Sequence, residues 1–118
     1  RRRTQPGNVL FCCVDKIDAR RLIWEAVKDR VAFFADGRMT AEVIRILTAC
    51  DPAGRQHYPT TLFTPGEAFA GSCTSKMTVF SASIAAGLMI SQFSRWLRRM
   101  PAEKDQTLNL LAGELTCQ

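Results

Sequence analysis

The stretch NVLFCCVDKIDARR, residues 8 to 21, decides the fold of this 118-residue chain. It opens with the apolar run Asn8 to Val14, which is rich in β-branched and aromatic side chains and therefore predicts a strand covered on both faces. The run stops at Asp15. Asp18 then has the residue type of a helix N-cap. Apolar residues follow at helical spacing at Leu22, Ile23, Ala26 and Val27. A strand followed by a helix is the predicted unit.

The next segments predict one mixed α/β domain that extends over residues 1–118. Val31 to Ala35 predicts a second strand, which is expected to end at the turn-forming pair Asp36 and Gly37. Glu42 to Ala49 predicts a third strand, at an edge or antiparallel. Asp51 to Thr61 contains two prolines and a glycine, so it is expected to be irregular and exposed.

The second half of the chain predicts a long helix. Thr64, Pro65 and Glu67 form a helix-start signature. The longest helical pattern runs from Lys76 to Met100, and its small residues permit close approach to a sheet. Thr107 to Leu115 is apolar, and a strand and a short helix both stay open because its periodicity does not decide between them.

Composition indicates a folded globular domain, with 47% hydrophobic and 23% charged residues. The net charge of +5 is spread in small groups without interleaved aromatic residues. We therefore expect solvated basic faces rather than a nucleic-acid site. The uncharged stretch Met77 to Ser94 has nearly the length of a membrane span, but six polar residues within it favour a buried helix and no membrane insertion.

The five cysteines show no CxxC spacing, so no zinc site is expected. No secretory signal precedes them, which predicts free thiols in a reducing cytoplasm. Cys12 and Cys13 are neighbours on a predicted strand and should point to opposite faces as core filling. His57 has no identifiable partner and is expected to be a surface residue.

Asp15 is the residue that most indicates a functional site. Ligands of parallel sheets bind beyond the carboxyl ends of the strands, and Asp15 sits at such an end. A carboxylate there can hold Mg²⁺ and so neutralise a triphosphate. The alternative is that Asp15 only caps the following helix, a common role of aspartate.

The phrase DKIDAR, followed by an amphipathic helix and then FFADGRM, resembles the DNxxxR segment of the ThiF, MoeB and HesA family and of ubiquitin-activating enzymes. The resemblance implies a Rossmann-like mixed sheet with flanking helices, and it implies that Asp15 serves Mg²⁺ and ATP. Asp18 and Arg20 match later positions of the motif. Lys16 replaces the family's usual asparagine, so a phosphate contact and a lost site are both open. Arg38, in DGRM, either reaches the same site or forms a structural salt bridge.

A second stretch, GSCTSKMTVFSASIAAGLMISQFSRWL at 71 to 97, is similar to the family's cysteine-containing crossover and the apolar helix after it. In ubiquitin-activating enzymes a Cys-Thr pair at this place carries the thioester nucleophile, which implies that role for Cys73. A thiol before a helix N-terminus, with Lys76 nearby, is shifted toward the thiolate. The alternative is that Cys73 is an ordinary small residue at a helix entry.

The family resemblance implies adenylation, with ATP and Mg²⁺, of the C-terminal glycine of a ubiquitin-like or ThiS/MoaD-like small protein. The family's opening GxGxxG loop has no counterpart here, so the chain is expected to be the carboxyl-terminal part of such a domain and inactive alone. Whether it is an enzyme stays open. The alternative is a non-catalytic interaction or dimerisation module of the same fold. An uncovered sheet edge predicts a homodimer in either case.

Overall fold

The computed structural model describes residues 8–63 and 79–118, which fold around a five-stranded mixed sheet. Its strands lie in chain order: β1 (Val9–Cys12), β2 (Phe33–Thr40), β3 (Val43–Ala49), β4 (Asp105–Asn109) and β5 (Glu114–Cys117). β1 and β2 are parallel, and the other neighbouring pairs are antiparallel. The predicted α/β class is confirmed.

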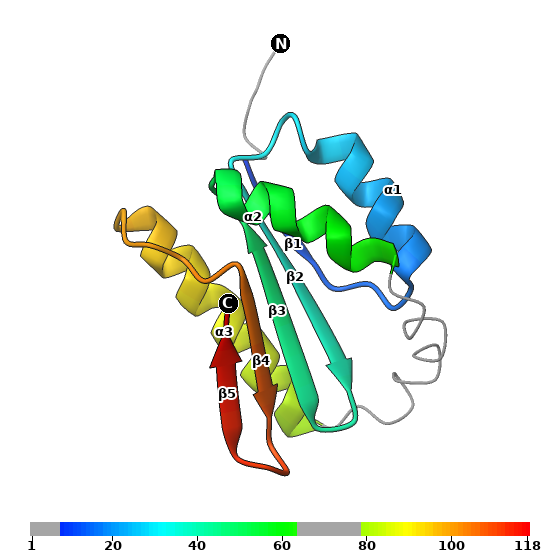
Figure 1. Cartoon of the computed structure of the whole chain (residues 1–118), viewed down its shortest axis with the longest axis vertical. Helices are drawn as coiled ribbons and strands as arrows, with labels where there is room; N and C mark the ends of the chain where they lie inside the picture. Colours follow the sequence, from blue (N-terminus) through cyan, green and yellow to red (C-terminus); the bar gives the residue numbers. More distant parts are fainter. Residues whose placement is uncertain (1–7, 64–78) are drawn as a thin grey trace.

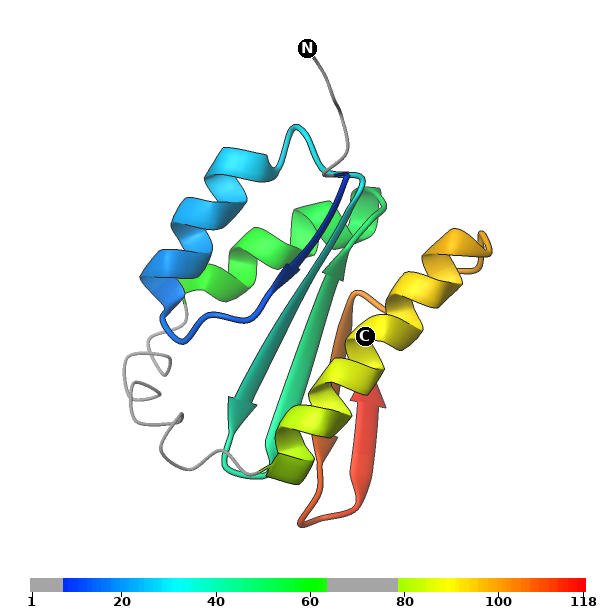
Figure 2. The same ribbon diagram turned by 180° about the vertical axis from the view of Figure 1, so that it is seen from behind.

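The helices lie on both faces of the sheet (Figure 1). One face carries α1 (Ile17–Val27), α2 (Pro52–His57) and the 3-10 helix η1 (Tyr58–Phe63). The other carries α3 (Val79–Leu97), which crosses the sheet diagonally (Figure 2). No helix in the described ranges is long and apolar enough to cross a membrane.

The predicted strand and helix of the opening stretch are both present, with different boundaries. β1 ends at Cys12, and α1 begins at Ile17 with Lys16 as its N-cap, whose side chain makes no capping bond. The prediction that Asp18 is the N-cap is wrong, since Asp18 lies in the first turn. A negative charge favours that end of the helix dipole, and the Asp18 carboxylate also accepts from Arg21 at 3.0 Å.

The predicted turn at Asp36 and Gly37 is wrong, because β2 continues through both residues to Thr40. The chain reverses instead near Ala41, which has a positive φ of 55°. Gly37 has a packing role: a Cβ there would lie 2.8 Å from Met89 Sδ on α3. The glycine therefore permits close approach of the helix.

The interpretation of the third strand as antiparallel is confirmed, and the edge alternative is wrong, since β3 lies between β2 and β4. Its side chains serve two cores. Ile44 and Ile46 pack with Ala85 and Met89 of α3, and Leu47 packs with the core under α1 and η1. The core under α1 and η1 contains three aromatic rings with centroids 4.9 to 5.0 Å apart, from Trp24, Phe34 and Tyr58.

The segment from Asp51 to Thr61 was expected to be irregular and exposed, and that prediction is wrong. It forms α2 and η1. Asp51 caps α2 by accepting from the Gly54 N–H at 2.7 Å. Gly54 lies against β3, where a Cβ would be 2.5 Å from the Thr48 carbonyl oxygen. Proline and glycine therefore start and dock a helix here rather than break one.

The remaining predictions concern the second half of the chain. α3 confirms a long helix within the predicted range. The alternative left open at Thr107 to Leu115 resolves as a hairpin, in which β4 and β5 are joined by a turn with Gly113 at a φ of 69°. The helix-start signature at Thr64, Pro65 and Glu67 lies outside the described residues.

Candidate functional site

A cavity of about 330 Å³ opens where the edge strand β1 stops. Three parts of the chain form it: the end of β1 with the segment after it, the middle of β2, and one flank of α3. The lining residues are Phe11, Cys13, Val14, Asp15, Arg20, Gly37, Met39, Ala82, Ala85, Ala86, Met89 and Ile90. The cavity is mostly apolar, with Asp15 and Arg20 as its charged residues. Mostly apolar pockets with a few convergent polar groups are typical of small-molecule sites.

Asp15 is the acidic residue among those that line this cavity. The residue is exposed and lies three positions after Cys12, the last residue of β1, whereas the parallel strand β2 continues to Thr40. Among the described residues, no donor bonds to its side chain. The N-cap of α1 is Lys16, so the capping alternative for Asp15 finds no support. Lys16 is exposed and is not among the lining residues.

Arg20 extends from α1 to the cavity and bonds to side-chain and backbone groups at its rim. Its guanidinium donates to Asp36 Oδ1 at 2.9 Å and to the Val14 carbonyl oxygen at 2.6 Å. A third, longer bond of 3.4 Å goes to the carbonyl oxygen of Asp15. Burial acts to lower the pKa of Arg20, but the Asp36 carboxylate outweighs it and the net shift is upward. Arg20 is therefore a fixed cation that positions the backbone of the Asp15 segment.

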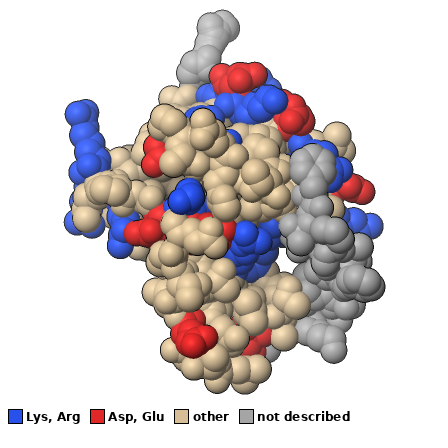
Figure 3. All heavy atoms as spheres, viewed as in Figure 1, with Lys and Arg blue, Asp and Glu red and all other residues tan. Residues whose placement is uncertain are grey.

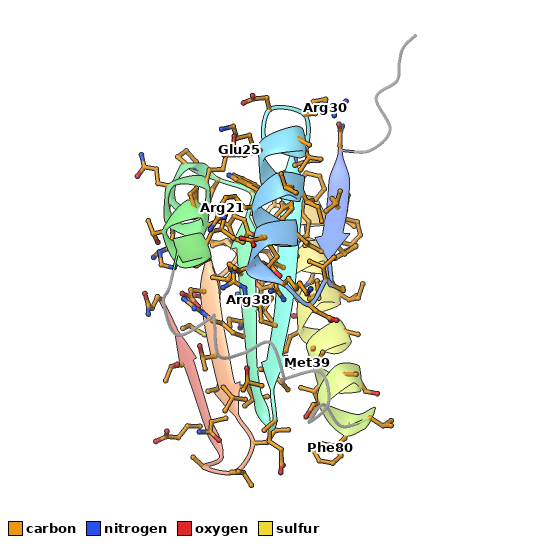
Figure 4. All side chains as sticks on the ribbon, turned by 90° about the vertical axis from the view of Figure 1, so that its right-hand side faces the viewer. Arg21, Glu25, Arg30, Arg38, Met39 and Phe80 are labelled. Atoms are coloured by element: carbon orange, nitrogen blue, oxygen red, sulfur yellow. The ribbon has the colours of Figure 1, made fainter. Side chains whose placement is uncertain are left out.

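Arg38 lies on the other face of the sheet from the cavity. Figure 4 shows it on β2 beside Met39, and successive side chains of a strand point to opposite faces. Arg38 is buried and donates to Asp36 Oδ2 at 3.2 Å and to Thr61 Oγ1 at 2.8 Å. The structure thus brings Asp15 and Arg20 together and joins Arg38 to them through Asp36.

Asp36, predicted to lie in a turn, lies instead on β2 at the centre of this network. It is fully buried on β2 and accepts from Arg20, Arg38 and the Tyr58 hydroxyl, the last at 2.7 Å. Burial, and then the Asp36 charge, raise the pKa of Tyr58, so the phenol stays neutral and donates. The sequence contained one signal for this network: residues two apart on a strand share a face, and this spacing holds for Phe34, Asp36 and Arg38.

Neither cysteine at the end of β1 is an activated thiol. The prediction that both fill the core from one strand is right for Cys12, which is buried at the end of β1, and wrong for Cys13, which follows the strand and is exposed. Burial, followed by the Asp36 charge, raises the pKa of Cys12 to about 11, and the same causes raise the pKa of Cys13. Both are thiols at neutral pH and weak nucleophiles. Cys73, the predicted nucleophile, lies outside the described residues.

His57 was expected to be a surface residue without a partner, and that prediction is wrong. Its Nε2 lies 2.7 Å from Asp105 Oδ2. Arg45 donates to both oxygens of the same carboxylate, at 3.0 and 2.7 Å. These contacts join the end of α2 to β3 and β4. Burial acts to raise the pKa of Asp105, but Arg45 and His57 outweigh it and the net shift is downward.

No group of three or more His, Cys, Asp or Glu side chains suited to a metal ion occurs in the described parts of the chain. Mg²⁺ does not need such a group, because it commonly binds through one or two carboxylates, water and the phosphates of a substrate. The single free carboxylate of Asp15 fits that mode of binding. Lys and Arg side chains on the face shown in Figure 3 lie in separate groups, several of them beside acidic residues, and form no continuous stripe.

Comparison with protein-family models finds no family that matches this chain. Comparison with curated proteins finds no matching relative.

Proposed function

We propose that this chain is part of an ATP-dependent adenylyltransferase and that the cavity beyond β1 receives the nucleotide. The observation that carries the proposal is the position of the unpaired Asp15 residue, which lines a cavity just beyond the carboxyl end of β1, a strand parallel to its neighbour β2. The sequence resemblance at DKIDAR supplies the reaction class: the C-terminal glycine of a small ubiquitin-like or ThiS/MoaD-like protein is joined to the α-phosphate of ATP, and pyrophosphate leaves.

The residues around the cavity support separate roles in this reaction. Asp15 would hold Mg²⁺, which supplies charge neutralisation to a bound triphosphate. Arg20 keeps the Asp15 segment in place through its bonds to the carbonyl oxygens of Val14 and Asp15. Lys16 is one residue away and exposed, so its ammonium is free to contact a phosphate. Arg38, whose side chain lies on the opposite face of β2 from the cavity, stabilises the arrangement through its bond to Asp36.

The volume of the cavity agrees with a partial nucleotide site. At about 330 Å³ it is near the lower end of the roughly 300–1,000 Å³ that small-molecule sites occupy. Its few polar groups are suited to an ion and to phosphate, whereas the sequence has no glycine-rich loop to surround a triphosphate with backbone N–H groups. We therefore propose that this chain does not activate ATP alone. The resemblance at residues 71 to 97 supports a second step, in which the Cys73 sulfur attacks the acyl carbonyl of the adenylate, the bond to the phosphate breaks, and a thioester and AMP result.

The test is exchange of labelled pyrophosphate into ATP. It is run on this chain and on a longer version that contains the upstream nucleotide-binding half of the proposed family, each with the small-protein substrate. We expect exchange only from the longer version. Asp15→Asn should abolish it, because the amide carries no charge to hold Mg²⁺.

Asp18→Asn is the matched control, since Asp18 is an exposed aspartate on the same segment that does not line the cavity. It should retain exchange. Equal loss in both variants, or undiminished exchange in Asp15→Asn, contradicts the assigned role of Asp15. For Cys73, a thioester adduct that reducing agent and Cys73→Ala both remove is the expected result.

A second candidate is a non-catalytic interaction module of the same fold. It is favoured by the fixed state of the arginines: both Arg20 and Arg38 are buried and bonded to Asp36, which leaves Asp15 as the free charged group at the cavity. Absence of exchange from the longer version, with the small protein still bound, would favour this module over the enzyme.

A further inference from the structure

The walls of the cavity beyond β1 are apolar apart from two charged residues. Phe11 on β1, Met39 on β2, and Met89 and Ile90 on α3 give it large apolar side chains. An ion or a phosphate group gains nothing from such walls, because they offer no hydrogen bonds. Apolar walls with a few fixed polar groups are typical of sites that bind a molecule with an apolar body.

Small residues on two elements keep this space open. Ala82, Ala85 and Ala86 lie within one turn of α3 and all line the cavity. Gly37 lines it from β2, where α3 approaches so closely that a Cβ would lie 2.8 Å from Met89 Sδ. Larger side chains at the three alanine positions would fill the cavity with the protein's own atoms.

Arg20 gives the cavity a cation whose hydrogen-bonding capacity is only partly used. Its side chain is 7% exposed, and a guanidinium has five N–H groups. Nε and Nη2 make bonds of ordinary length, at 2.9 Å to Asp36 Oδ1 and 2.6 Å to the carbonyl oxygen of Val14. The other contacts are longer: Nη1 lies 3.4 Å from the carbonyl oxygen of Asp15, and Nη2 lies 3.5 Å from that of Gly37. The second N–H of Nη1 has no acceptor among the described residues.

The underused Nη1 lies on the side of Arg20 that faces the cavity. The Nε side contacts Asp36, which is fully buried in the interior, whereas Nη1 points toward Asp15, which lines the cavity. Asp36 bonds to Arg20 through one oxygen, because its other oxygen accepts from Arg38 and Tyr58. A second carboxylate on the cavity side would complete the hydrogen bonding of Arg20. Charge-assisted bonds of this kind are strong where water is excluded.

We propose that the cavity binds a small apolar carboxylic acid, with its carboxylate on Arg20 Nη1 and its hydrocarbon chain between β2 and α3. Such an acid is ionised at neutral pH. Asp15 is exposed, so water and salt screen its repulsion of the ligand. A water molecule takes up about 30 Å³ in the liquid, so a cavity of about 330 Å³ has room for about ten non-hydrogen atoms. Octanoate is a molecule of this size.

This ligand goes beyond the proposed adenylation. Because the cavity has room for one small molecule, the acid and the nucleotide would compete for it, and only that competition rests on the proposed function. Binding of the acid is measured without metal or nucleotide. Failure of pyrophosphate exchange therefore leaves this proposal intact, and failure of acid binding leaves the proposed function intact.

The first test is calorimetric titration of the wild-type chain with octanoate. One molecule should bind per chain, and binding should saturate. Octanol, which has the same chain length and no charge, should bind about tenfold or more weakly, because it makes no charge-assisted bond to Arg20. Octylamine should also bind more weakly, because Arg20 repels its cation. Absence of saturable octanoate binding overturns the proposal, and so does octanol or octylamine binding as tightly as octanoate.

A variant that fills the cavity tests the location. Ala86 is exposed and lines the cavity, so Ala86→Phe should fold normally and weaken octanoate binding by about tenfold or more. Ser83→Phe is the matched control, since Ser83 is an exposed residue of α3 that does not line the cavity, and it should bind as the wild type does. Circular dichroism checks that both variants fold. Unchanged affinity in folded Ala86→Phe, or equal loss in both variants, contradicts the proposal.

Backbone amide NMR of the wild-type chain locates the ligand without any variant. Octanoate should produce its largest shifts at Cys13, Asp15 and Gly37, which surround the Nη1 end of Arg20. The signals of α2, on the opposite face of the sheet from α3, should stay unchanged. Largest shifts centred away from the cavity would overturn the proposal.

Discussion

At the scale of single residues, the buried Asp36 carboxylate determines how the site is built. It holds one arginine from α1, one from β2 and the hydroxyl of Tyr58 from η1. Two guanidinium groups share one carboxylate in the interior, so the cluster depends on that single negative charge. Buried charges persist only when they are paired and hydrogen-bonded.

Replacement of Asp36 by asparagine should therefore be strongly destabilising. The change leaves two buried cations without a counter-charge, and loss of one partner in a buried ion pair costs about 3–5 kcal/mol. Chemical denaturation followed by circular dichroism measures this free energy of unfolding. Asp29→Asn, at an exposed position, should change it by less than about 0.5 kcal/mol. Equal stability of the two variants would contradict the role given to Asp36.

The Asp105 cluster predicts a pH dependence of stability. Because Arg45 and His57 lower the pKa of Asp105 in the folded protein, its contribution is present above the unfolded pKa of about 3.9 and is lost as pH falls through the folded value. Denaturation at a series of pH values should show the unfolding free energy decreasing below about pH 5. Asp105→Asn should be less stable at neutral pH and should lose less on acidification. A parallel curve for Asp105→Asn and the wild type would contradict this account.

At the scale of elements, glycines show how the helices dock on the sheet. Gly54 brings α2 against β3, whereas a Cβ added at Gly87 on α3 would meet no atom of the described residues within 4 Å. The same substitution should therefore have opposite effects at the two positions.

Gly54→Ala should destabilise the fold by about 1–3 kcal/mol, the usual cost of overpacking, because the new Cβ collides with the Thr48 carbonyl oxygen and the backbone of β3 cannot yield as a flexible side chain can. Thermal or chemical unfolding measures the change. An alanine variant as stable as the wild type would show that α2 does not sit this close to β3.

Gly87→Ala should stabilise the fold by up to about 1 kcal/mol, because alanine is the better helix former and its methyl group meets open space among the described residues. Chemical denaturation of the variant and the wild type measures the difference. A less stable variant would indicate a contact at this position that the described fold does not contain.

An element could be predicted from the sequence where a local residue pattern determines its conformation. It could not be predicted where contacts with a distant segment determine it. The apolar run at 8–14 and the helical spacing after Asp18 are local, and both elements are present. Asp36 and Gly37 have the residue types of a turn, but Arg20 and Met89, from other elements, determine their roles. For the site, the position of Asp15 at a strand end was predictable. The α3 wall of the cavity and the Asp36 network depend on packing that no local pattern encodes.

At the scale of the whole molecule, α3 serves both the core and the candidate site. Its buried side forms a core with β2 and β3, and one flank closes the cavity beside Asp15. Ala86 and Ile90 of that flank line the cavity and are also exposed, so this wall of the cavity reaches the protein surface.

The central claim is that Asp15 holds a divalent cation together with a nucleotide at the end of β1. Paramagnetic broadening of backbone amide NMR signals by Mn²⁺ with ATP tests it most directly, because broadening reports distance from the ion and needs no turnover. We predict that the signals of Cys13, Asp15 and Gly37 broaden first, that Asp15→Asn removes this effect and that Asp18→Asn retains it. Broadening that is unchanged in Asp15→Asn, or that is centred away from the cavity, would contradict the account.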